Sequence, residues 1–284
     1  MKIAISGVGG FIGSYLSDYF KGVGHEIMPL HREMFQPEHQ ELLNGSIAKS
    51  EVVINLAGRS VFCRWTERNK MEILNSRIET TRKIVHAINH SSTKPQLFIS
   101  ASAVGYYPSD GCYDEFHQRK GKGFLPDVCE KWEEEAEKVS PEVRLAITRF
   151  GIVLAPKGGA FPKMILPSKV GMGMVLGSGD QSFSWIDIRD LARAMEFIME
   201  HGKIDGPINL TAPEQITNKN FTHIVSRHYN TKVSLHLPES FLKLFLGEAA
   251  GFLLKGQCIS PLKLIKEGFT FYSPNTTKFL QSLP

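Results

Sequence analysis

The sequence predicts an α/β protein, in which a Rossmann fold with a doubly wound parallel sheet carries a smaller C-terminal α/β substrate lobe. Two observations support this prediction. A glycine-rich turn directly follows the first strand, and strands alternate with helices as far as His201. Alternating strands and helices are typical of a parallel sheet whose ligand crevice lies at the carboxyl ends of the strands.

The first element is a short strand, Lys2–Ser6, and the pattern Gly7-x-x-Gly10-x-x-Gly13 follows at once. In such a turn the first glycine permits a tight reversal, and the second lets the backbone approach a pyrophosphate. The third lets the next helix, which begins at Phe11, lie close to the sheet. The free N–H groups of that helix favour an anion, so we predict a dinucleotide site. The residues predicted to line it are Gly7, Gly10, Phe11, Ile12 and Gly13.

The end of the second strand, predicted over His25–Leu30, indicates which dinucleotide binds. A free ribose 2′-hydroxyl is recognised by an acidic residue about 20 residues past the glycines, whereas a 2′-phosphate needs a cation. This sequence has His31 and Arg32 there, ahead of the first acidic residue, Glu33. We therefore predict NADP (NADPH) rather than NAD. The alternative is that Arg32 is an ordinary solvated loop residue.

The third and fourth strands, predicted over Glu51–Leu56 and Gln96–Ser100, end in small and polar residues. Such ends leave room for a flat cofactor, although small residues end many strands. Between them runs a long helix, Arg68–Asn89, and its Arg77 either reaches the cofactor or is a solvated helix arginine. The further cofactor-binding candidates are Leu56, Ala57, Gly58, Arg77 and Ser100.

The remaining regular elements are a strand over Arg144–Val153 and helices over Val128–Val139 and Asp187–His201. After Lys157 the strand–helix alternation gives way to glycine, proline and long hydrophobic residues until near Asp187. We predict an NADP-binding domain over 1–157 plus about 187–201, and a smaller substrate-binding lobe over 158–186 and 202–284.

Composition and charge exclude several classes of protein. A net charge of +4 without a basic run gives no nucleic-acid footprint, and no apolar stretch is long enough to cross a membrane. The cysteines Cys63, Cys112, Cys129 and Cys258 form no C-x-x-C pair, so neither a zinc site nor a disulfide framework is indicated. We expect a cytoplasmic protein with a small-molecule substrate and no metal; monomer and homodimer both stay open.

Several short motifs occur in an order and spacing that resemble a known family. They are the glycine pattern and the segments Asn55–Gly58, Ser100–Tyr107, Gly177–Gln181 and Gly206–Asn209. With them, essentially the whole chain resembles an atypical, extended short-chain dehydrogenase/reductase of the NAD-dependent epimerase-like family. The subfamily that it resembles has a DUF1731-type C-terminus, and some of its bacterial members are known as cell-division-inhibitor homologues.

Members of that superfamily resemble one another in using a Ser, a Tyr and a Lys, the last two spaced as Tyr-x-x-x-Lys. The resemblance implies that Ser102 positions the substrate oxygen and puts Lys131 at the lysine position. There an ammonium group would lower the pKa of the tyrosine and hold the ribose. The tyrosine position, however, is Asp127. An aspartate with its ordinary pKa of about 4 is ionised at neutral pH and is a weak proton donor.

Three explanations for the missing tyrosine stay open. Tyr106 or Tyr107 supplies the phenol from beside Ser102, or Asp127 has a raised pKa, or the site binds NADP and does no redox work. In the simpler alternatives, the two tyrosines pack under the cofactor and Lys131 is a solvated helix lysine. If Lys131 does serve the cofactor, it must point inward while the glutamates of its helix face water. Those glutamates are Glu130, Glu133, Glu134 and Glu137.

The resemblance implies an NADP-dependent oxidoreductase or epimerase-like enzyme that acts on a small carbonyl or hydroxyl substrate, with a sugar nucleotide as one option. Its expected catalytic residues are Ser102, Tyr106 and Lys131. The rival hypothesis is a non-catalytic NADP-binding sensor or partner-docking protein, which the missing tyrosine favours. The substrate itself is not specified by the sequence.

Overall fold

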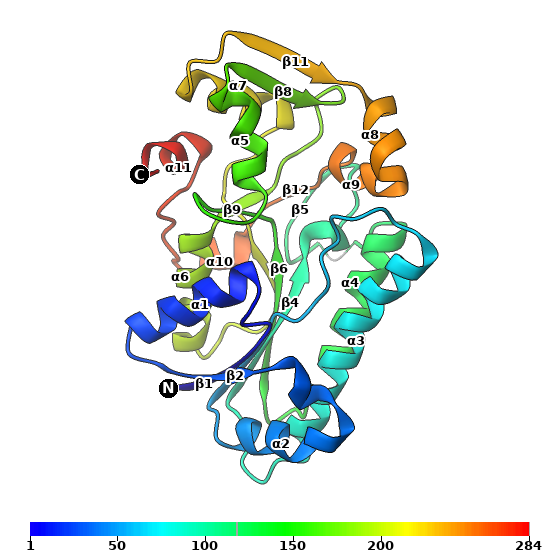
Figure 1. Ribbon diagram of the computed structural model, residues 1–284. Coiled ribbons are helices and arrows are strands. Elements are labelled where there is room, and N and C mark those ends of the chain that lie inside the picture. The colour runs from blue at the N-terminus through cyan, green and yellow to red at the C-terminus, as the bar shows by residue number, and fades with distance from the viewer. Residues whose placement is uncertain (118, 284) are drawn as a thin grey trace.

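A parallel sheet of six strands forms the centre of the computed structural model, which describes residues 1–117 and 119–283 (Figure 1). Its order is β10-β6-β4-β3-β1-β2, so the chain moves to one side of β1 and then to the other. The reversal between β1 and β3 creates the crevice where doubly wound sheets bind ligands. The strands are β1 (Lys2–Ser6), β2 (Glu26–Leu30), β3 (Val52–Asn55), β4 (Leu97–Ala103), β6 (Arg144–Phe150) and β10 (Gly206–Leu210).

Helices cover both faces of this sheet, as predicted for a Rossmann fold. Successive strand residues point to opposite faces, so Ile3 and Ile5 pack with one helix layer and Ala4 with the other. All three are fully buried. The first layer is α1 (Phe11–Gly22) and α6 (Ile188–Glu200); the second is α2 (Gln40–Ala48), α3 (Glu67–Asn89) and α4 (Phe124–Ala136). Figure 1 shows α1 and α6 on the left of the sheet and α3 and α4 on the right.

A smaller lobe lies above the carboxyl ends of the sheet strands (Figure 1). It has its own aromatic core, in which Phe161, Trp185 and Phe279 are fully buried. In this lobe β8 pairs with β11 and β7 pairs with β9. The elements are β7 (Ile152–Leu154), α5 (Phe161–Lys169), β8 (Met172–Leu176), β9 (Trp185–Asp187), α7 (Asn218–His228), β11 (Val233–Leu237), α8 (Glu239–Leu246), α9 (Ala250–Leu254) and α11 (Thr276–Gln281).

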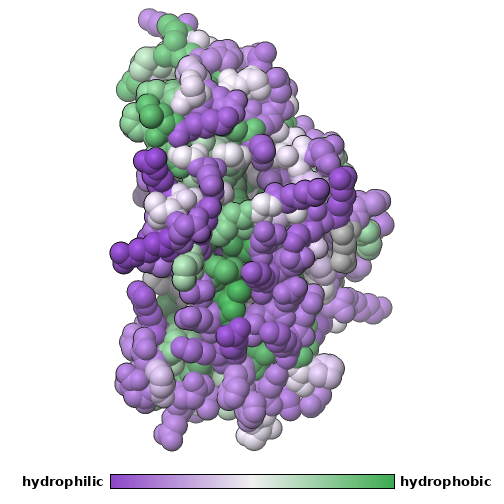
Figure 2. Space-filling view, turned by 90° about the vertical axis from the view of Figure 1, so that its right-hand side faces the viewer, coloured by the Kyte–Doolittle hydropathy of each residue, from purple (hydrophilic) through white to green (hydrophobic). Residues whose placement is uncertain are grey.

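The face that carries α3, α4 and α8 is mainly hydrophilic, with hydrophobic side chains gathered toward the smaller lobe (Figure 2). Exposed apolar residues of α8 include Leu244 and Phe245. Among the described residues, no helix combines the length and the apolar character that crossing a membrane requires.

Two of the predicted boundaries were wrong. Residues 206–210 were assigned to the smaller lobe, but β10 pairs with β6 at the edge of the main sheet. The segment after it, α10 (Leu262–Lys266) and Phe269, also packs into the core that contains Ile3. The predicted strand over Arg144–Val153 is two strands, because the chain leaves the sheet at Gly151. A Cβ there would lie 2.9 Å from the carbonyl oxygen of Ser184.

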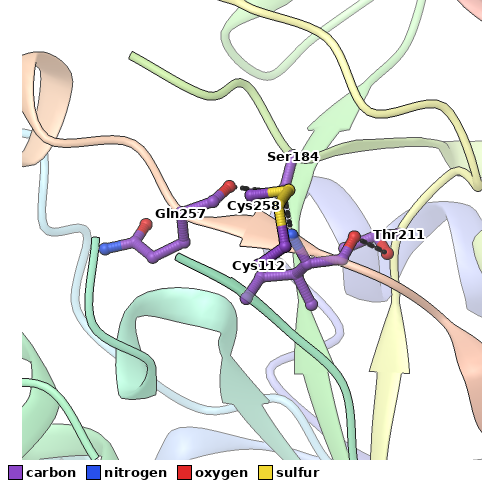
Figure 3. Close-up of a disulfide and its surroundings, with 6 residues drawn as sticks. Cys112, Ser184, Thr211, Gln257 and Cys258 are labelled. Carbon is purple, nitrogen blue, oxygen red and sulfur yellow. Dashed lines mark hydrogen bonds between the residues drawn. A yellow bond between two sulfur atoms is a disulfide. The ribbon is translucent and has the colours of Figure 1, made fainter. Parts of the chain in front are cut away.

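A disulfide joins Cys112 to Cys258, so the prediction of no disulfide was wrong (Figure 3). The two cysteines lie in a short parallel pair formed by β5 (Cys112–Tyr113) and β12 (Cys258–Ile259). They are 146 residues apart in the sequence. No local spacing marks such a pair, because only the return of the C-terminal segment to the main sheet brings the two sulfur atoms together.

Candidate functional site

The glycine turn after β1 has a backbone that side chains would disrupt. Gly7 has a φ of +75°, and the N–H of Gly10 donates to the carbonyl of Gly7 at 2.9 Å. A Cβ on Gly13 would overlap that same carbonyl. The N-terminus of α1 then begins with no side-chain cap and no acidic residue in its first turn. Its N–H groups are therefore available to an anion, as predicted for the phosphates of a dinucleotide.

The end of β3 forms the opposite wall of this turn, and Asn55 fixes its shape. Its side-chain oxygen, Oδ1, accepts from Ser6 Oγ at 2.7 Å and from the N–H of Ala57 at 3.2 Å. The N–H of Leu56 donates to the same serine oxygen at 3.2 Å. The wall approaches the turn closely, because a Cβ on Gly7 would lie 3.1 Å from the Leu56 carbonyl. The predicted residues at the two strand ends thus lie side by side.

Arg77 holds the loop after β3 in place. Its Nη1 donates to the carbonyls of Arg59 at 3.0 Å and Ile73 at 2.9 Å, and its guanidinium lies 5.0 Å from the ring of Trp132. Burial lowers its pKa. A Cβ on Gly58 would lie 3.1 Å from the guanidinium carbon, so Gly58 must be small. Arg77 is therefore packed against the crevice wall and is not the solvated arginine of the alternative hypothesis.

His31 and Arg32 follow β2 and are exposed. The parallel register places Leu30 beside Ser6, so these two residues emerge next to the glycine turn. Within the described part of the chain, the Arg32 side chain forms no hydrogen bond and no salt bridge. A free cation at this strand end is the arrangement that recognises a ribose 2′-phosphate.

A buried hydroxyl provides a test of whether a dinucleotide fits this crevice. Ser100 Oγ, on β4, has no hydrogen-bond partner among the residues that the structure describes, although Ser100 is only 1% exposed. The register places it beside Asn55, at the crevice wall. Buried hydroxyls are normally paired, so the site suits a ligand with a polar group. Together with the glycine turn, this hydroxyl fits the predicted cofactor.

The next pair of strand ends carries a buried ionic network. Ser102 on β4 and Arg149 on β6 are register partners, and both contact Glu133 from α4. Ser102 Oγ donates to Glu133 Oε1 at 2.5 Å. Arg149 binds the carboxylate with two parallel bonds, Nε to Oε1 at 2.9 Å and Nη2 to Oε2 at 2.6 Å. Arg149 is 1% exposed. Although burial acts against its charge, the bonds and the charge of Glu133 raise its pKa.

The two tyrosines that were candidates for the missing phenol surround the same guanidinium. Arg149 Nη1 donates to the hydroxyl of Tyr107 at 2.8 Å, and that hydroxyl donates to Asn209 Oδ1 on β10 at 3.0 Å. The guanidinium carbon lies 3.7 Å from the ring of Tyr106. Burial raises the pKa of both phenols. Tyr107 is buried with its hydroxyl already paired, whereas Tyr106 is half-buried.

The structure does not bring Lys131 and Asp127 to Ser102. Lys131 is exposed, and Asp127 pairs with Lys120 at 3.0 Å on the outer side of α4. Glu133, which was expected to face water, is buried instead. The inward stripe of the helix follows the spacing i, i+3, i+4 and i+7. It contains Cys129, Trp132, Glu133 and Ala136, with Val128 beside them as expected, and Glu135 is also buried.

Cys129, two residues before the exposed Lys131, lies on the buried side of α4. Its Sγ lies 3.7 Å from the carbonyl oxygen of Ala103, and burial raises the pKa of the thiol to about 12. The thiol therefore stays protonated at neutral pH and cannot supply the charge of a lysine. Sequence reasoning missed Glu133 and Arg149. Their signal was a single arginine inside the otherwise uncharged and buried stretch Leu145–Phe150, which requires a buried partner.

Comparison with known proteins identifies the family. The model for the NAD dependent epimerase/dehydratase family matches residues 3–211, and that for a domain of unknown function, DUF1731, matches residues 237–283. Epimerase family protein YfhF of Bacillus subtilis is 36% identical over 95% of this chain and 94% of its own length. Mouse epimerase family protein SDR39U1 is 31% identical over 100% of this chain and 99% of its own.

A solved structure agrees with these matches. The crystal structure of human epimerase family protein SDR39U1 (isoform 2) with NADPH has a TM-score of 0.91. It is 30% identical in sequence and covers 100% of this chain and 99% of its own. The Rossmann fold and the resemblance seen in the motifs are thereby confirmed, as is the expectation of a nicotinamide cofactor. The chain belongs to the NAD dependent epimerase/dehydratase family, with a DUF1731 domain at its C-terminal end.

Proposed function

We propose that this protein is an NADP(H)-dependent oxidoreductase or epimerase-like enzyme that acts on a carbonyl or hydroxyl group of a small molecule. The observation that carries the proposal is the buried network of Ser102, Glu133 and Arg149, which lies at the ends of β4 and β6, on the same edge of the sheet as the glycine turn. Buried charges are costly to maintain. Such charges beside a cofactor crevice are typical of a site that handles a polar substrate.

The geometry supports a set of residues that would hold the cofactor. The turn from Gly7 to Gly13 would bind the pyrophosphate, Arg32 would bind the 2′-phosphate, and the strand end Leu56–Gly58 would contact the adenosine half. Ser100 would pair its free hydroxyl with the cofactor. When bound, NADP(H) supplies or accepts the hydride.

Ser102 would act on the substrate as a hydrogen-bond acceptor. Its only proton is donated to Glu133, so the lone pairs of the serine oxygen stay available. A substrate hydroxyl could donate to this oxygen, and Ser102 would take up the substrate proton while passing its own proton to the Glu133 carboxylate, which would be the general base. Arg149 would keep Glu133 in place, and Tyr106 would be the phenol closest to the reacting group. This arrangement favours an alcohol over a ketone as the resting ligand.

The cofactor part of the proposal is tested by titration calorimetry. NADPH should bind at least about tenfold more tightly than NADH, because only NADPH offers a 2′-phosphate to Arg32. Arg32→Asp should abolish that preference. The matched control is Arg227→Asp on α7, which changes the net charge equally at an exposed position outside the crevice. Equal affinities for the two cofactors in the parent protein would contradict the assignment of Arg32.

The catalytic part is tested with a panel of alcohols, carbonyl compounds and sugar nucleotides. Net oxidation or reduction is followed by the absorbance of NADPH, and epimerisation, which leaves that absorbance unchanged, by NMR of the products. Turnover that Ser102→Ala reduces by at least about a hundredfold, with NADPH affinity unchanged, would support the enzyme. Cys63→Ser is the control, because Cys63 lies in the loop before α3 and forms no bond with Glu133 or Arg149.

A second function is favoured by one observation. The side chains at the expected Tyr-x-x-x-Lys positions, Asp127 and Lys131, lie on the outer face of α4. This supports a non-catalytic NADP-binding sensor or partner-docking protein. Tight NADPH binding without turnover of any compound in the panel would favour the sensor over the enzyme.

A further inference from the structure

The disulfide between Cys112 and Cys258 ties together two segments that are held to different degrees. Cys258 lies in β12, which side chains of other elements fix in place (Figure 3). Ser184 Oγ accepts from the N–H of Ile259 at 3.1 Å, and Thr211 Oγ1 donates to the carbonyl of Ile259 at 3.3 Å. The Cys258 side therefore keeps its position without the sulfur–sulfur bond.

The Cys112 side belongs to the loop from Pro108 to Tyr113 and is exposed. The polar contacts of this loop stay largely local, since the hydroxyl of Tyr113 donates to Asp110 at 2.5 Å. Beyond the disulfide, residues 108–112 have the two-residue pairing of β5 with β12 as their tie to the C-terminal segment; the next ties lie further along, in the packing of Tyr113 on the cluster that contains Ile259 and in Glu115, which accepts from the N–H of Lys263 at 3.1 Å. One such pairing is weak by itself. The loop therefore depends on the disulfide far more than β12 does.

This loop contacts the candidate site through the packing of two aromatic rings. The ring of Tyr113 stacks on that of Tyr107, with centroids 6.0 Å apart and an interplanar angle of 15°. The hydroxyl of Tyr107 accepts from Arg149, the cation of the buried network. A change in the loop would thus change the packing over one side of that network.

We propose that Cys112–Cys258 is a redox-controlled clasp, which an external dithiol opens while the rest of the fold stays intact. In the closed, oxidised state the loop 108–113 is locked onto Tyr107. In the open, reduced state this loop is released and β12 remains in place. The exposed position of Cys112 gives a reductant access, which is the property that separates labile disulfides from buried structural ones. This inference does not depend on the proposed function.

The chemical step is thiol–disulfide exchange. One thiolate of the dithiol attacks Cys112 Sγ, which forms a mixed disulfide and releases Cys258 as a thiolate that takes up a proton. The second thiol of the reductant then attacks the mixed disulfide, closes its own cyclic disulfide and releases Cys112. Two electrons and two protons pass to the protein, and the dithiol is oxidised.

The test uses the full chain, dithiothreitol as the probe, and no denaturant. Reduction should add two reactive thiols to that of Cys63, since the buried Cys129 does not react without denaturant, and oxidised dithiothreitol should remove them again. Hydrogen exchange read by mass spectrometry should become at least about tenfold faster at residues 109–113 and change less than about threefold at 257–261. Cys112→Ser should show the same fast exchange without any reductant.

The control variant is Cys63→Ser, which should lower the thiol count by one in both states and leave hydrogen exchange unchanged. Two outcomes would overturn the clasp. One is that the two additional thiols appear only in denaturant, which would make the disulfide structural. The other is that reduction speeds exchange equally in both segments, which would mean that the bond supports the whole C-terminal region.

Discussion

The two ends of the crevice are built by different means. At the cofactor end, from Gly7 to Gly13 and along the end of β3, the shape comes from backbone that approaches backbone. At the other end, Ser102, Glu133 and Arg149 meet from a strand, a helix and a second strand, and their side chains make the site. The comparison teaches that the family fold constrains the first end through glycine positions. The second end depends instead on three side chains that must meet with matching hydrogen bonds and charge.

The largest expected effect comes from breaking the network at the side-chain end. Glu133→Gln would leave the guanidinium of Arg149 buried without its counter-charge, so the free energy of unfolding should fall by about 3–5 kcal/mol. Urea denaturation measures this change. The matched control is Glu134→Gln, one residue away on the exposed side of α4, which should leave stability unchanged within error. Equal, small effects for both variants would show that the buried pair is not needed.

A smaller effect is expected from the backbone end. Gly13→Ala would force the glycine turn to shift, because its Cβ overlaps the carbonyl of Gly7, and should cost about 1–3 kcal/mol. NADPH affinity should fall at least about tenfold. Gly45→Ala is the control, since nothing lies within 4 Å of its Cβ in α2 and alanine favours a helix by about 0.5–1 kcal/mol. If the Gly13 variant bound NADPH normally, the turn would not be a cofactor site.

A third prediction concerns pH and the buried Glu115, which supports the side-chain end from the loop side. It accepts from the N–H groups of Asn209 at 2.9 Å and Lys263 at 3.1 Å, and burial raises its pKa. A carboxyl group whose folded pKa lies above its unfolded value stabilises the fold at low pH, and this stability is lost as the pH rises through the folded pKa.

The variant Glu115→Gln removes this titration. From about pH 4 to about pH 7, the free energy of unfolding of the parent should therefore fall relative to that of the variant. Urea denaturation of both proteins across that range measures the difference. Other carboxyl groups affect both proteins equally, so a constant or opposite difference would contradict the raised pKa.

The smallest expected effect is that of Lys131→Met. The lysine is exposed on α4, so NADPH affinity should stay within about twofold of the parent value. Calorimetry provides the measurement. A clear loss of affinity would mean that this lysine reaches the cofactor after all, and that the two ends of the crevice are coupled through α4.

The sequence predicted the backbone-built end well. The glycine turn, the alternation of strands and helices and the free cation at Arg32 are all local signals, and each follows from spacing within a few residues. The side-chain end was predicted only in Ser102 and the two tyrosines beside it. Glu133 was missed because a run of glutamates on one helix suggests a solvated face. The buried stripe expected for α4, with Val128, Trp132 and Ala136, is correct, but Lys131 at its edge faces solvent, whereas Cys129 and Glu133 lie on the buried side.

The disulfide and β10 were missed for the same physical reason. Each depends on a segment that pairs with a strand formed much earlier in the chain, and such long-range pairing leaves no periodic trace in the sequence. Cys112 and Cys258 lie 146 residues apart, and β10 pairs with a strand that ends some 56 residues earlier, from Phe150 to Gly206.

The return of the C-terminal segment has a consequence for synthesis on the ribosome. The core that holds Ile3 and Ile5 also contains Leu264 and Phe269. At elongation rates of about 5–20 residues per second, the first strand waits on the order of 15 to 50 s before its last apolar partners emerge. During that interval the nascent NADP-binding domain exposes an incomplete core. We therefore expect nascent chains stalled near residue 157 to be sensitive to protease. Chains in which Phe269 has emerged from the ribosome should be resistant.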